Sequence, residues 1–75
     1  MKFAFLIMGD FSSKSDRAAI HNGSAQMIGV GDIEEACSVA KELYEKGIGC
    51  IELCGAFGPE GAKRVIEATK NKIPV

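Results

Sequence analysis

The sequence predicts an α/β protein: a small parallel sheet with flanking helices. Two observations lead to this prediction. Apolar segments of strand length alternate along the chain with amphipathic segments of helix length. Strands that alternate with helices favour a parallel sheet joined by right-handed crossovers. Two architectures fit this order, an open flavodoxin-like sheet, which we prefer, and part of a barrel of the triosephosphate isomerase type.

Composition narrows the class of protein. The 75 residues are 47% hydrophobic and 25% charged, with a net charge of −1, which suits one globular domain over residues 1–75. The near-zero charge and the lack of a basic cluster argue against nucleic-acid binding. The longest apolar run, Phe3 to Met8, is too short to span a bilayer, and Gly9-Asp10 follows it without a signal-peptide cleavage pattern. We therefore expect a cytoplasmic protein that binds neither nucleic acid nor membrane.

The cysteines indicate neither a disulfide framework nor a zinc site. Cys37, Cys50 and Cys54 are an odd set without CxxC spacing. We expect three reduced thiols, no metal and no cofactor.

The first half of the chain predicts a strand, a short helix and a second strand. Residues 3–8 are apolar on both alternating faces, which is typical of a strand in the middle of a parallel sheet. Ser15 is a possible cap for a short helix over residues 16–21, which Asn22-Gly23 would close. Residues 26–30 are expected to form a short strand.

The next helix is the best supported element. Asp32 is a plausible N-cap, Glu35 three residues later makes a capping-box-like pair, and Gly47 is a natural stop. Between them an apolar stripe recurs at helical spacing: Ile33, Ala36, Cys37, Ala40, Leu43 and Tyr44.

The last part of the chain predicts a strand over residues 49–53 and a helix that begins at Gly58, with Pro59 suited to its first turn. Its inner face would comprise Ala62, Val65, Ile66 and Thr69, and Asn71 would close it. A further apolar stretch opens at Ile73-Pro74-Val75, but a strand usually needs more than three residues. We expect this last strand to be incomplete, either truncated or completed by another element or another chain. A core of this size is marginal, so a homo-oligomer is attractive.

The candidate site lies where the parallel strands end, because ligands of such sheets bind at that edge. Asp10 follows the first strand and the loop Gly55-Ala56-Phe57-Gly58 follows the third. Backbone N–H groups at the start of the last helix favour an anion. The glycine spacing is neither a Walker loop nor a dinucleotide fingerprint, so a purely structural turn is the alternative.

Three side chains are candidates for catalysis. Glu52 stands in an otherwise apolar strand, and burial would raise its pKa, as a general acid or base requires. The alternative is that Glu52 lies at a sheet edge or pairs with a lysine. Cys54 would be a nucleophile if the helix terminus lowers its pKa, and His21 is the only histidine that could assist it. His21 reaches the site only if the segment after the first strand lies at that edge.

Two functions follow. The first is binding of a small anionic metabolite at the carboxyl edge of the sheet, with proton transfer next to a carbonyl as the chemistry that these groups could support. The second is a non-catalytic, self-associating structural module. Whether the protein is an enzyme stays open at this point.

Several stretches carry a resemblance to a known family: KFAFLIMGDF, DRAAIHNGSAQMIGV, IEEAC, GCIELCGAFGPEGAKRVIEAT and NKIPV. With them the chain resembles, over essentially its whole length, a family of short prokaryotic proteins catalogued as a domain of unknown function, DUF6506. The resemblance implies no established activity. It implies that the last strand is incomplete, because family members continue past the IPV-type strand. The stretch IELCGAFGPEG is also similar to strand–turn segments of phosphate-handling barrel enzymes, which implies an acid or base role for Glu52.

Overall fold

A computed structural model describes residues 1–75 as one four-stranded sheet with two α helices. The elements in chain order are β1 (Phe3–Met8), β2 (Arg17–Ile20), β3 (Ala25–Val30), α1 (Ile33–Glu45), β4 (Cys50–Leu53) and α2 (Gly58–Ala68). Two single 3-10 turns, η1 (His21–Gly23) and η2 (Gly55–Phe57), precede β3 and α2.

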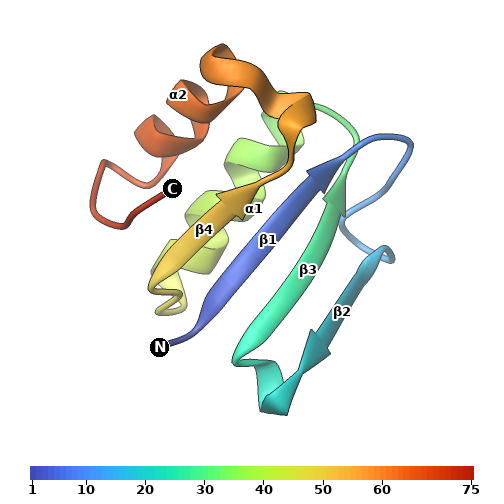
Figure 1. Cartoon of the computed structure of the whole chain (residues 1–75), viewed down its shortest axis with the longest axis vertical. Coiled ribbons are helices and arrows are strands. Elements are labelled where there is room, and N and C mark those ends of the chain that lie inside the picture. Colours follow the sequence, from blue (N-terminus) through green and yellow to red (C-terminus); the bar gives the residue numbers. More distant parts are fainter.

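The sheet is open and mostly parallel, with the strand order β2-β3-β1-β4 (Figure 1). β1 is central and pairs in parallel with β3 on one side and with β4 on the other, whereas β2 pairs antiparallel with β3. The predicted open α/β sheet with β1 in its middle is therefore confirmed, and the partial-barrel alternative is wrong.

The helix predicted over residues 16–21 is also wrong, because Arg17–Ile20 is an edge strand. Asn22 and Gly23, which were expected to close that helix, adopt positive φ angles of 56° and 87° and turn the chain into a hairpin with β3. Asn-Gly signals a hairpin turn as strongly as a helix stop, since both need φ angles that other residues avoid.

α1 lies behind the sheet in the view of Figure 1, α2 lies beside α1 next to the β4 edge, and both helices contribute to one core on the same face of the sheet. The strand residues that point toward them include Ala4, Leu6, Ile28, Val30 and Ile51, all buried. With side chains from the helices and the loops they form one core of 12 buried residues. The opposite face carries no helix. The molecule therefore has two layers, one helical and one sheet.

α1 begins and ends where the sequence predicts. The Asp32 carboxylate accepts a hydrogen bond from the Glu35 N–H (2.7 Å), and Gly47 has a φ of +93° after the last turn. Its buried face contains Ala36, Ala40 and Leu43 as expected, together with Val39. The other residues of the predicted stripe are only half-buried: Ile33, Cys37 and Tyr44.

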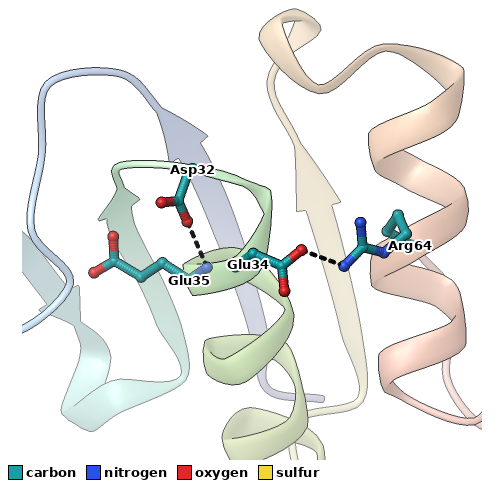
Figure 2. A network of polar contacts seen from close by, with 4 residues as sticks. All are labelled: Asp32, Glu34, Glu35 and Arg64. Atoms are coloured by element: carbon teal, nitrogen blue, oxygen red, sulfur yellow. Dashed lines mark hydrogen bonds and ion pairs between the residues drawn. The ribbon is translucent and has the colours of Figure 1, made fainter.

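α2 begins at Gly58 with Pro59 in its first turn, as predicted. Of its predicted inner face, Val65 and the C-cap Thr69 are buried, whereas Ala62 and Ile66 are only half-buried. An ion pair of 2.6 Å between Glu34 and Arg64 joins the exposed sides of α1 and α2 (Figure 2). Neither helix is both long enough and apolar enough to cross a membrane.

The end of the chain lies along the outer edge of β4. The Pro74 carbonyl accepts a hydrogen bond from the Ile51 N–H (2.9 Å), and the side chains of Ile73 and Val75 pack against the core. No strand forms over residues 73–75.

The Glu35 carboxylate fastens the loop between β1 and β2 to the start of α1. One oxygen accepts from the Ser13 N–H (2.8 Å) and the other from the Gly31 N–H (2.6 Å). Together with the Ser13 hydroxyl, which has the largest effect, these donors lower the pKa of Glu35 to about 2. Glu35 therefore does not complete the expected capping box with Asp32, and instead joins two other segments.

We expect Glu35→Gln to lower the melting temperature by a few degrees at neutral pH, because the amide cannot accept from all of these donors as an anion does. The pKa is depressed in the folded state, so the stabilisation is present in full above the unfolded pKa of about 4.5. It is lost as the pH falls toward 2. The difference in melting temperature between wild type and variant should narrow over that interval in thermal melts followed by circular dichroism.

Glu45→Gln is the matched control, because Glu45 lies on the same helix, is exposed and makes no hydrogen bond or ion pair. A Glu35→Gln deficit that stayed constant from pH 6 to pH 2 would contradict the role assigned to this carboxylate.

Candidate functional site

The carboxyl edge of the parallel strands collects part of the site that the sequence predicts. β1, β3 and β4 end at this edge, followed by Asp10, by the α1 start and by η2 respectively (Figure 1). Cys54 lies against β1: its N–H donates to the Leu6 carbonyl (3.1 Å), and its Sγ accepts from the Met8 N–H (3.4 Å). Its half-buried side chain packs against the core.

The predicted role of Glu52 as a general acid or base requires a buried side chain, but the Glu52 side chain is exposed. It lies on β4, an edge strand, in register with Phe5 and on the face that no helix covers. No lysine or arginine pairs with it. The burial on which that role depends is therefore missing.

His21 lies at the opposite edge of the sheet from Cys54. It belongs to η1, the turn that leads into the first residue of β3. The length of a six-residue strand, about 20 Å, separates the two edges. The structure does not bring His21 to the predicted site.

The glycine loop before α2 is shaped mainly by packing. The Phe57 side chain is buried in the core, whereas Gly55, Ala56 and Gly58 are exposed. Gly58 has φ and ψ of 62° and 177°, a conformation that only glycine adopts without strain. No side chain caps η2 or α2, and Glu60 stands in the first turn of α2. None of the four pockets of the structure is lined by this loop.

The largest feature that sequence reasoning missed is the uncovered face of the sheet, which we call the open face. The strand register places on it ten side-chain positions: Phe3, Phe5 and Ile7 of β1, Ala18 and Ile20 of β2, Ala25, Met27 and Gly29 of β3, and Cys50 and Glu52 of β4. Glu52 is the one charged residue among them.

The open face exposes large apolar side chains to solvent. Ile20 is 69% exposed, Met27 46% and Phe3 37%. A pocket of about 340 Å³ on this face is lined by six hydrophobic residues and Gln26. The alternation of Phe3, Phe5 and Ile7 along β1 is the sequence signal for this face, but it does not say whether a helix covers it.

Phe11 covers the end of the open face nearest the carboxyl edge. A Cβ placed on Gly29 would come within 2.7 Å of the Phe11 side chain, so this aromatic ring lies directly on the backbone of β3. Phe11 itself remains 40% exposed and adds to the apolar surface.

The described chain offers no metal centre, since no three His, Cys, Asp or Glu side chains lie close enough to hold an ion, and all three cysteines are free.

Comparison with known proteins adds a family but no activity. A family model described as a family of unknown function (DUF6506) matches residues 1–75, in agreement with the resemblance seen in the sequence. No curated protein and no solved structure matches the chain.

We expect Gly58→Ala to destabilise the fold by about 1–3 kcal/mol, because alanine is strained at a φ of 62°. Gly55→Ala is the matched control in the same loop: its φ is not positive, and an added Cβ at either glycine meets no atom within 4 Å. Gly55→Ala should leave the free energy of unfolding unchanged or slightly raised. Urea denaturation measures both, and equal losses in the two variants would refute the conformational argument.

Proposed function

The chain belongs to DUF6506, a family of unknown function, and we propose that it is a non-catalytic, self-associating module whose open face binds a second copy of itself. The observation that carries this proposal is the apolar surface that β1, β2 and β3 present on the face opposite the helices. The largest contiguous apolar patch on a protein surface often marks an interaction site.

The area of the open face is sufficient for a dimer. From the exposed fractions of Phe3, Phe11, Ile20 and Met27, and with 150–250 Å² for a whole aromatic side chain, these residues and their half-buried neighbours expose roughly 500 Å². Two copies that pack face to face would then bury about 1,000 Å², which is near the lower limit for a specific interface. We therefore expect a weak, concentration-dependent dimer.

The chemistry of the face favours a second copy as the occupant. Two apolar sheets stack about 10 Å apart with interdigitating side chains, which would convert two two-layer subunits into a four-layer dimer. A twofold axis makes the same patch serve both subunits. Glu52 is the one charged side chain on the face and lies on its edge strand, so the centre of the contact contains no charge.

We assign this module to the cytoplasm. The support is chemical: the three cysteines are free thiols, which persist in a reducing compartment.

We expect Met27→Glu to convert the dimer to a monomer, because it places a charge at the centre of the open face, where pairing would strip its water. Lys63→Gln is the matched control: it changes the net charge by the same amount at an exposed site on α2. Sedimentation velocity over a range of micromolar concentrations measures the mass. A wild-type monomer throughout, or a Met27→Glu dimer as stable as the wild type, would contradict the proposal.

A second candidate function is the one expected from the sequence, binding of a small anionic metabolite at the carboxyl edge. The observation in its favour is that no side chain caps α2, so that the N–H groups of its first turn remain available to an acceptor. The exposed Gly55, Ala56 and Gly58 leave the backbone accessible, and Asp10 and Cys54 lie at the same edge.

A thermal-shift screen with phosphorylated sugars and carboxylates tests this second function. A ligand of this loop should raise the melting temperature of the wild type, and Gly58→Val should abolish the shift by changing the path of the backbone. Glu52→Gln should leave the shift unchanged, because Glu52 is exposed on the open face. This candidate fails if no compound raises the melting temperature of the wild type.

A further inference from the structure

A cleft lies on the helical side of the sheet, between β2 and α1. α1 contacts β1 and β3, and neither helix runs behind β2 in Figure 1. Arg17 and Ala19, the β2 residues that point to the helical side, are consequently exposed. Two adjoining pockets, of about 430 Å³ and 290 Å³, occupy this space and share Arg17 and Glu42 in their walls.

Taken together, the two pockets have an excess of two positive charges, whereas the pocket lined by Lys14 and Arg17 has equal numbers of cations and carboxylates. Its walls contain four cations, Lys2, Lys14, Arg17 and Lys46, and two carboxylates, Glu35 and Glu42. Both carboxylates are engaged, Glu35 by backbone N–H groups and Glu42 by Lys46 at 3.8 Å.

Three of the cations, by contrast, have no carboxylate within ion-pair distance: Lys2, Lys14 and Arg17. No carboxylate therefore occupies these three side chains by direct contact, although the charge of Lys14 also acts on the nearby Glu35 carboxylate.

The Arg17 guanidinium is held in place. Its Nε donates to the Ser13 carbonyl (2.7 Å), and Ser13 is in turn buried and fixed by its N–H bond to Glu35. This contact uses one of the five guanidinium N–H donors and leaves both terminal nitrogens free. A guanidinium held in this way can bind two oxygens of a phosphate or carboxylate at once, with less loss of side-chain entropy than a free one.

We propose that this cleft binds a compact, doubly charged oxyanion, held by the Arg17 guanidinium and the Lys14 ammonium. The Ser38 hydroxyl, on the α1 wall of the pocket, offers a further donor. The site is separate from the open face, which lies on the other side of the sheet, and from the loop before α2. The proposed anion site therefore does not depend on dimerisation through the open face.

Calorimetric titration of the 75-residue chain with inorganic phosphate and with malonate tests the site, with acetate as the singly charged comparison. We expect phosphate or malonate to bind, acetate to bind more weakly, and the affinity to fall as salt is raised. The stronger of the two dianions identifies the source as a phosphate ester or a dicarboxylate.

Arg17→Gln and Lys14→Gln should each weaken binding by about tenfold, the loss expected for one charge-assisted hydrogen bond. Arg17→Lys keeps the charge without the planar fork and should fall in between. Lys63→Gln removes an equal charge from α2 and should bind as the wild type does. The binding result of a variant is interpreted only if its amide NMR spectrum remains dispersed, which shows that the variant is folded.

The proposal is overturned if neither dianion binds at tens of millimolar, or if Lys63→Gln weakens binding as much as Arg17→Gln. It is also overturned if only Gly58→Val removes the binding, since the anion would then sit on the loop before α2.

Discussion

Both helices of this protein contribute to one core on one face of the four-stranded sheet, and the other face is left without a helix. β1 is apolar on both sides: Ala4 and Leu6 lie under the helices, while Phe3, Phe5 and Ile7 point the other way. Because α1 and α2 pack on the same face, the second apolar face of the central strand has no cover within the chain. Burial of apolar surface is the main stabilising force in a small domain. Association that buries the uncovered sheet face would therefore add to the free energy of stabilisation.

The strand β2 is the reason that the cover is missing. In a doubly wound sheet, the segment after β1 would be a crossover helix packed on the sheet. Here the same segment pairs antiparallel with β3, which widens the sheet by one strand and adds no helix. The presence of a strand where a doubly wound sheet would have a helix creates both surfaces for which we propose roles. It extends the open face through Ala18 and Ile20, and it leaves Arg17 beside an unfilled space next to α1.

One carboxylate supports both surfaces. Glu35 holds Ser13, and the loop around Ser13 carries Phe11 onto the open face and leads through Lys14 to Arg17 in the cleft. Glu35 was expected to act within its own helix terminus as half of a capping box. Instead it binds other segments, because a carboxylate at the start of α1 lies within hydrogen-bond distance of the Ser13 and Gly31 N–H groups.

The amino-acid sequence by itself determined the elements that depend on local chemistry. It determined β1 through continuous apolar character, α1 through Asp32 and Gly47, and the start of α2 through Gly58-Pro59. Local chemistry does not distinguish a hairpin turn from a helix stop at Asn22-Gly23, because positive φ serves both, so β2 was predicted as a helix.

Only the tertiary structure decided which face of each strand is covered, that Glu52 is exposed, that His21 lies at the far edge, and that Arg17 borders a cleft. These are relations between segments far apart in the chain. They depend on which face of the sheet the helices cover. The alternation of side chains along a single strand does not reveal this.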